Sequence, residues 1–153
     1  MDETKRPLPP VYFYAGLAAM IGLHVLFPIV RFYRYVDPVV RYAGLAPILA
    51  GVALNLWADG LFKKAGTEVK PFRESSSLVT DGPFRMSRNP MYLGGLLIFI
   101  GTAVLLGSLM AVLVIPPMMA LVHVHFIVPE ERDMARQFGA EYDAYRRRVR
   151  RWL

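Results

Sequence analysis

The chain has 153 residues, a length that suits one domain, and 55% of them are hydrophobic, with a mean hydropathy of +0.36. The apolar residues lie in long runs, which is typical of membrane proteins rather than of soluble cores. The net charge is +6, but the basic residues flank these runs, so they favour anionic lipid headgroups over nucleic acid as a partner. The absence of cysteine excludes disulfides, thiolate catalysis and cysteine-bound metals.

Two apolar runs in the first half of the chain predict two membrane-spanning helices, over residues 11–30 and 39–62. Lys5 and Arg6 resemble the basic start of a signal peptide, but the first run is long for the apolar part of one and no clear small-x-small cleavage site follows, so we expect a retained helix. The second run contains Asn55 and Asp59, which lie one helical turn apart and share a face. Nothing in the sequence assigns a ligand to either residue.

Residues 91–128 then contain no Asp, Glu, Lys or Arg. At roughly 1.5 Å per residue, half of this run spans about 28 Å, close to the thickness of a hydrocarbon core. Gly107-Ser108 at its centre predicts a turn between two helices, over residues 91–107 and 109–128, and Pro116-Pro117 predicts a kink in the second. A re-entrant hairpin in place of these two spans remains open, and it leaves the flanking polar segments on the same side.

The sequence therefore predicts an all-α integral membrane bundle in a single domain, residues 1–153, with about four transmembrane helices and an interfacial C-terminal helix. If both termini lie inside, fifteen of the 18 Lys and Arg residues are cytoplasmic, against Arg31, Arg34 and Arg41 outside. The positive-inside rule then places both polar segments at the cytoplasmic face.

The first polar segment, residues 66–90, is rich in turn signals. Gly82-Pro83 and Asn89-Pro90 mark turns, and Pro90 suits the first position of a helix that has Asn89 as its N-cap. The free N–H groups of that helix start, together with Arg88, form a site for an anion or carboxylate. In the alternative interpretation the arginines of this segment extend to lipid headgroups.

The second polar segment, residues 129–153, opens with Glu130-Glu131. Carboxylates at a membrane boundary are costly unless they are paired or solvated, so an inward-pointing one indicates a functional site, while a helix cap or an ion pair with Arg132 is the alternative. An apolar stripe of helical spacing follows and predicts an amphipathic helix that anchors the domain to the leaflet and roofs the site. The stripe consists of Met134, Phe138, Tyr142, Tyr145, Val149 and Trp152.

Other polar residues give no site. His123 and His125 lie two positions apart on a predicted helix, so they point to different faces and make no metal pair. We therefore expect no bound metal. Nucleotide-binding and hydrolase motifs, such as a Walker loop, GxGxxG or HExxH, do not occur in the sequence.

The two polar segments together resemble the membrane methyltransferase family of isoprenylcysteine carboxyl methyltransferases and phospholipid N-methyltransferases. The likeness is carried by GPFRMSRNPMYLG at residues 82–94, by Glu130-Glu131, and by FGAEYDAYRRRV at residues 138–149. It extends from about Gly66 to the C-terminus and is nearest to the small prokaryotic members, which implies a location in the inner membrane.

The resemblance implies that S-adenosyl-L-methionine binds between these segments at the cytoplasmic face. Matched by position, the expected cofactor contacts are Ser76, Ser77, Leu78, Val79, Phe84, Asn89, Pro90, Met91, Tyr92 and Glu130. Phe84 stands where the family usually has Tyr, and Asn89 replaces the His of the RHPxY motif. The Glu130 carboxylate suits the amino group or the ribose hydroxyls of the cofactor.

Arg88 and Glu131 are the expected catalytic residues, with Glu131 as the base for an amine acceptor. Prenylcysteine enzymes have an Arg four residues before the position of Glu130, where this chain has Phe126. That departure disfavours a prenylcysteine carboxylate and favours another lipid-like or isoprenoid-bearing acceptor, which reaches the site laterally from the bilayer. The alternatives are an NADPH-dependent membrane reductase of related architecture and a non-catalytic membrane scaffold.

Overall fold

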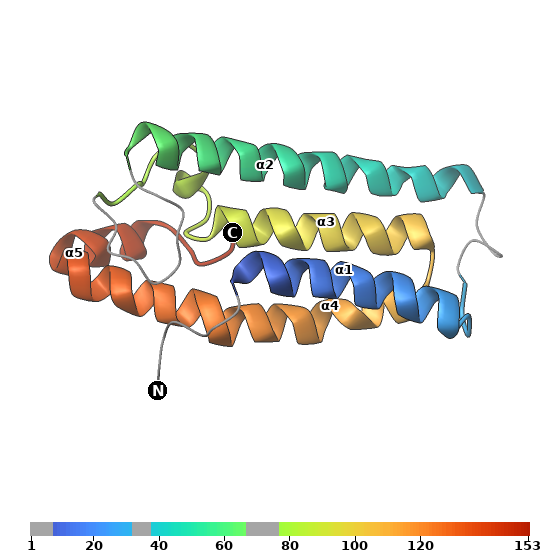
Figure 1. Ribbon diagram of the computed structural model, residues 1–153. Coiled ribbons are helices and arrows are strands. Elements are labelled where there is room, and N and C mark those ends of the chain that lie inside the picture. The colour runs from blue at the N-terminus through green and yellow to red at the C-terminus, as the bar shows by residue number, and fades with distance from the viewer. Residues whose placement is uncertain (1–7, 32–37, 67–76) are drawn as a thin grey trace.

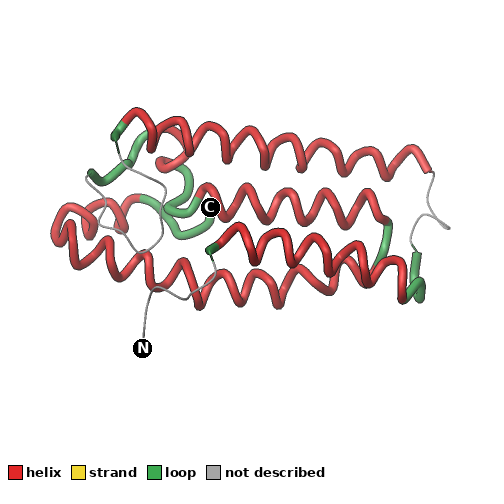
Figure 2. The backbone as a smooth tube through the Cα atoms, in the orientation of Figure 1, coloured by secondary structure: helices red, strands yellow, loops and turns green. Residues whose placement is uncertain are grey.

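The computed structural model describes residues 8–31, 38–66 and 77–153, and these form a bundle of long helices joined at its two ends (Figures 1 and 2). The α-helices are α1 (Pro9–Leu26), α2 (Leu45–Lys64), α3 (Pro90–Leu106), α4 (Leu109–Val122) and α5 (Val128–Arg148). Two short 3₁₀ helices, η3 (Pro38–Gly44) and η4 (Gly82–Arg85), precede α2 and α3, and a π-helical turn, η5 (His123–Ile127), joins α4 to α5. The described residues contain no β-strand.

Three helical stretches are long and apolar enough to cross a membrane, namely Pro9–Leu26, Val39–Lys64 and Leu109–Arg148. The helix α3 is apolar but shorter, with 17 residues. Large apolar side chains point outward, and Leu49, Leu56 and Val25 are each more than 60% exposed. Helices that are apolar on their outer and inner faces are typical of a bundle in lipid. The predicted class, a helical membrane protein, is confirmed.

The helix boundaries differ from the predicted ones at proline and glycine. The helix α1 ends at Leu26 rather than near residue 30, because Pro28 lacks an N–H and disfavours helical geometry in the residue before it. Residues 38–44 form the 3₁₀ helix η3, and the α-helix begins only at Leu45. The turn expected at Gly107 is present, with Gly107 left-handed at φ 55° as the C-cap of α3.

The closest packing in the bundle joins α2 to α3. Gly51 of α2 faces Gly94 of α3, and a Cβ on Gly51 would collide with the Gly94 carbonyl oxygen. One heptad away, Gly44 and Gly101 meet in the same way. Small residues let two helix backbones approach closely in lipid, where van der Waals contact drives association. This contact fixes α2 beside the first turns of α3.

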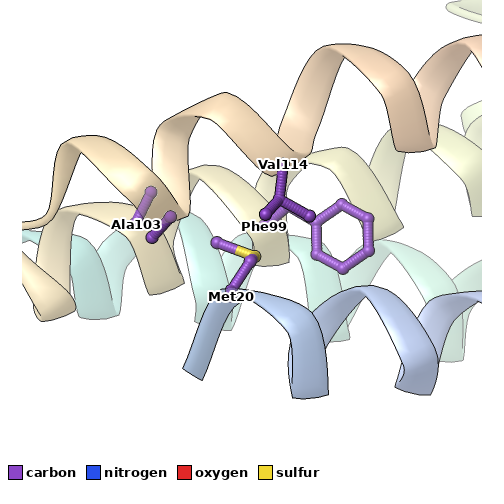
Figure 3. Close-up of a cluster of buried hydrophobic side chains, with 5 residues drawn as sticks. Met20, Phe99, Ala103 and Val114 are labelled. Atoms are coloured by element: carbon purple, nitrogen blue, oxygen red, sulfur yellow. The ribbon is translucent and has the colours of Figure 1, made fainter. Parts of the chain in front are cut away.

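A cluster of buried apolar side chains joins α1, α3 and α4 (Figure 3). Met20, Phe99 and Val114 come from the three helices and are at most 7% exposed. The rings of Phe13 and Phe99 stack with their centroids 5.2 Å apart. The helix α1 is therefore held against α4 and α3, and it has little contact with α2 in the described residues.

The last helical stretch changes geometry twice. In η5 the Val128 N–H donates to the carbonyl of His123, five residues back, a wide turn favoured by Pro129, which has no N–H and crowds the carbonyl of His125. At Gly139, with φ 49° and ψ −120°, α5 leaves helical geometry, and Figure 1 shows its second half running back toward the bundle. The predicted amphipathic helix is therefore interrupted at Gly139, because only glycine adopts this backbone conformation readily.

We expect Gly51→Ala to lower the stability by about 1–3 kcal/mol, because the new methyl group overpacks a backbone contact. Gly60→Ala on the same helix is the matched control, since no described atom lies within 4 Å of an added Cβ there. That control should be neutral or stabilising by up to about 1 kcal/mol. Thermal unfolding in detergent micelles measures both, and equal melting temperatures would contradict the close α2–α3 contact.

Candidate active site

A cavity of about 560 Å³ lies where α3, α5 and the segment before η4 meet, and it extends between the helices. Its polar end is formed by Ser77, Asn89, Glu130, Glu131 and Asp133. Its apolar part is lined from α1, α3 and α4 by Phe13, Tyr14, Leu96, Phe99, Met118 and Met119. One cavity thus joins charged groups at the bundle's end to an apolar space between the helices.

Glu130 is the carboxylate at the polar end of this cavity. It lies two residues beyond the uncharged run, and the Tyr92 hydroxyl donates to its Oε1 at 2.7 Å. Burial raises the pKa of Glu130 to about 7; the bond from Tyr92 opposes this shift and the nearby Asp133 adds to it. Glu130 is therefore a carboxylate that changes its protonation near neutral pH and has few protein partners.

Glu131 is in a different environment, between two arginines. Arg151 donates to both of its oxygens, at 3.0 and 2.7 Å, and Arg88 donates to Oε1 at 3.1 Å. Asn89 Nδ2 also donates to Oε1, at 3.3 Å. Burial raises the pKa of Glu131, but the hydrogen bonds and charges of Arg151 and Arg88 outweigh burial and hold the pKa below its usual value. A carboxylate held ionised in this way is a poor proton acceptor.

Arg88 is buried and ties the start of α3 to the C-terminal segment. Its Nη1 donates to the carbonyls of Arg146 and Val149, at 3.2 and 3.1 Å, in addition to the bond from Nη2 to Glu131. Its side chain is only 9% exposed. The guanidinium therefore neither reaches lipid headgroups nor presents a free charge to a substrate anion, the two roles that the sequence left open.

The C-terminal residues complete this connection through their backbone. The Arg88 N–H donates to the Arg150 carbonyl at 3.0 Å, and the Arg151 carbonyl accepts from Ser87 Oγ and Asn89 Nδ2 at 3.1 and 3.2 Å. Asn89 occupies the N-cap position of α3, but its side chain makes no capping bond. Its amide instead binds the C-terminal segment and Glu131.

Aromatic residues of α5 pack against α2 and η4 and form one wall of the cavity. Tyr142 and Tyr145 are 3% and 4% exposed and pack with Phe84 and Ala58, and the Tyr145 hydroxyl donates to the Phe84 carbonyl at 2.7 Å. Phe84 lies edge-on to Phe62 of α2, with centroids 5.1 Å apart. The apolar stripe of α5 was predicted to anchor this helix in the leaflet. Its two tyrosines lie instead in the protein interior, because the chain turns back at Gly139.

All predicted site residues within the described part of the chain line this one cavity. They are Ser77, Leu78, Val79, Phe84, Arg88, Asn89, Pro90, Met91, Tyr92, Glu130 and Glu131. Ser76 lies outside the described residues. The structure separates the two carboxylates, since Arg88 and Asn89 converge on Glu131 whereas Glu130 binds Tyr92.

Sequence reasoning missed several residues of the cavity. Asn55 of α2 lines it, as do Phe13 of α1 and Met118 of α4. Three buried polar atoms of cavity-lining residues, Asn55 Oδ1, Ser77 Oγ and Arg88 Nε, have no hydrogen-bond partner among the described residues. The one available signal was the polar Asn55 within an apolar run, and it did not indicate which neighbour the side chain faces.

Comparison with family models matches residues 39–141 to the phospholipid methyltransferase family. The match covers more than half of the chain, and the chain therefore belongs to this family of membrane methyltransferases. The matched region begins in η3, well before Gly66, where the resemblance of the sequence motifs begins.

Among solved structures, the fold is similar to that of the eukaryotic intramembrane Ras methyltransferase, isoprenylcysteine carboxyl methyltransferase, with a TM-score of 0.69 and 21% identity over 92% of this chain. At that identity the likeness concerns the fold, and this chain spans 50% of the length of that protein. A comparison with curated proteins finds no sequence that matches.

We expect Glu131→Gln to destabilise the protein by about 2–3 kcal/mol, because it leaves two arginines without their shared carboxylate. The value lies at or just below the range usual for buried pairs because the Arg151 side chain is 38% exposed. Asp81→Asn, which breaks the exposed Arg85–Asp81 pair, is the control and should leave the melting temperature unchanged. Equal effects of the two substitutions on thermal unfolding would refute the role of Glu131 as the link to the C-terminus.

Proposed function

We propose that the protein transfers a methyl group from S-adenosyl-L-methionine to a lipid-like acceptor at the membrane face. The observation that carries this proposal is the single cavity with Glu130 at its polar end and an apolar part between α1, α3 and α4. A water-soluble cofactor and a membrane-borne acceptor require such a site, with one end in each phase. Membership of a methyltransferase family gives the reaction type.

The residues present fit this cofactor. The Glu130 carboxylate suits a cationic amino group or ribose hydroxyls, and Ser77 Oγ is a buried polar atom without a partner among the described residues. Phe84, Tyr142 and Tyr145 supply aromatic surface suited to an adenine ring. When bound, the cofactor supplies a methyl group on a sulfonium whose thioether is already a good leaving group. The role of the protein is then to position the reactants and to exclude water from them.

The charges around the cavity favour an acceptor that is not anionic. Arg88 is neutralised by Glu131 and occupied by the carbonyls of the C-terminal segment. Phe126, at the position where prenylcysteine enzymes have an Arg, is 1% exposed and packs edge-on against Tyr12. The remaining charged groups of the lining are the carboxylates Glu130 and Asp133. An amine-bearing lipid meets these carboxylates better than a carboxylate substrate does.

For an amine acceptor the proton must leave before the nitrogen attacks, and Glu130 is better suited than Glu131 to receive it. Glu131 is held ionised by two arginines, whereas Glu130 has a pKa of about 7 and a short bond to Tyr92. We therefore propose Glu130 as the carboxylate that contacts the reactants and Glu131 as a positioning residue. The distribution of Lys and Arg supports a cytoplasmic site.

We expect wild-type protein in lipid nanodiscs to bind S-adenosylhomocysteine saturably in calorimetry, and Glu130→Gln to weaken that binding about tenfold or more, since a charge-assisted hydrogen bond is lost. Glu141→Gln, on the exposed surface of α5, is the matched control and should bind like the wild type. Absence of binding by folded wild-type protein would refute the proposed cofactor.

The affinity should also depend on pH. Because the pKa of Glu130 is raised to about 7, its carboxylate is ionised above that pH and neutral below it. If the ionised form is the one that binds, S-adenosylhomocysteine binding should be about tenfold weaker at pH 6 than at pH 8. Calorimetry across this range measures the effect, and Glu130→Gln should abolish it. A pH profile that persists in Glu130→Gln would assign the titration to another group.

A further inference from the structure

Gly95 is a glycine of α3 that the packing of the bundle does not require. At Gly94 and Gly101 of the same helix, an added Cβ would collide with a backbone carbonyl oxygen of the neighbouring segment. At Gly95 an added Cβ would meet, among the described atoms, only the ring of Phe13, at 3.6 and 3.7 Å, which is ordinary van der Waals contact. A glycine inside a helix costs stability relative to alanine, and close packing does not account for this one.

Gly95 lies on the wall of the cavity and is partly exposed, whereas Gly94 is buried. It follows Tyr92 by three residues, which corresponds to about 4.5 Å along the helix axis. The Tyr92 hydroxyl donates to Glu130 at the polar end of the cavity. Gly95 is therefore about one helical turn deeper in the bundle than the residue that holds the Glu130 carboxylate.

The cavity lining extends to both sides of Gly95. Ile98 and Phe99 also line the cavity, and helix geometry places them about 60° to one side of Gly95 and about 40° to the other. The Ile98 side chain lies beside Gly51 of α2, whereas the Phe99 ring stacks on Phe13 of α1. A side chain at position 95 would project between these two sides and take up cavity volume.

We propose that Gly95 is a specificity-determining residue, whose missing side chain admits acceptors that are broad next to their reactive group, such as a lipid in which two chains diverge there. The inference rests on the proposed function and deepens it. With the reactive group at Glu130, the part of the acceptor that follows it passes Gly95. Two chains occupy both sides of this position, whereas one chain needs a single side. A side chain at position 95 should therefore clash with the broader acceptor and spare the narrower one.

The test uses two acceptors that share a headgroup, dioleoylphosphatidylethanolamine and its lyso form with one oleoyl chain. Each is supplied in proteoliposomes of dioleoylphosphatidylcholine, with S-adenosylmethionine that carries a labelled methyl group. We expect Gly95→Leu to lower the ratio of kcat/KM for the two-chain lipid to kcat/KM for the one-chain lipid about tenfold. Binding of S-adenosylhomocysteine should stay within about twofold of wild type.

Gly22→Leu on α1 is the matched control, because no described atom lies within 4 Å of an added Cβ there and Gly22 lies outside the cavity lining. It makes the same change in another apolar helix. Neither the ratio nor the binding of S-adenosylhomocysteine should change in this variant.

Gly95→Ala tests the packing argument separately. The added methyl group fits at ordinary contact distance, so the melting temperature should equal or exceed that of wild type, and the ratio should fall by about threefold. A lower melting temperature would show that packing requires the glycine and would overturn the inference. Should Gly95→Leu not fold, as thermal unfolding would report, an unchanged ratio in Gly95→Ala would overturn it as well.

The remaining outcomes separate this inference from the proposed function. If wild type methylates both lipids and Gly95→Leu affects them equally or not at all, Gly95 does not discriminate between acceptors, and the inference alone fails. If Gly95→Leu weakens S-adenosylhomocysteine binding instead, Gly95 belongs to the cofactor site. If folded wild type binds no S-adenosylhomocysteine, or binds it and methylates neither lipid, the proposed cofactor or the proposed amine acceptor fails and the inference fails with it.

Discussion

The ion pairs of Glu131 are the interaction on which the polar half of the molecule depends. One carboxylate binds Arg88 just before α3 and Arg151 near the C-terminus, so two segments more than sixty residues apart are held together at one point. Tyr142 and Tyr145, which lie between Glu131 and Arg151 in the sequence, pack with Phe84 and Ala58. Among the residues that line the cavity, Arg88 and Glu131 offset each other, so Glu130 and Asp133 set the remaining charge of the lining.

The apolar half depends on a different constraint, the close approach of α2 and α3. Lipid supplies no hydrophobic force between helices, so contact between backbones must hold them, and Gly51 and Gly94 permit that contact. It positions Asn55 against α3, and η4 also packs on α2. The helix α1, in contrast, packs through side chains such as Met20 on α3 and α4 and has little contact with α2 in the described residues.

Much of this arrangement could be predicted from the sequence, because hydropathy, proline and glycine act locally. The uncharged run and Gly107 predicted the helical hairpin, and the motif residues that the structure describes do meet in one cavity. The separate environments of Glu130 and Glu131 could not be predicted, since they depend on Arg88 and Arg151 approaching from distant segments. The return of the chain at Gly139 could not be predicted, because a glycine weakens a helix without fixing the direction of the chain after it, and the apolar spacing continues through this one.

The π-helical turn η5 sets how the two adjacent carboxylates are oriented relative to α4. A regular helix advances by 100° per residue, and a π-turn accommodates one residue more than an α-turn does. If residues His123–Ile127 formed regular α-helix, every side chain beyond them would be rotated by about 100° relative to α4. The separate environments of Glu130 and Glu131 therefore depend on the backbone hydrogen bonds of five residues that themselves contribute no carboxylate.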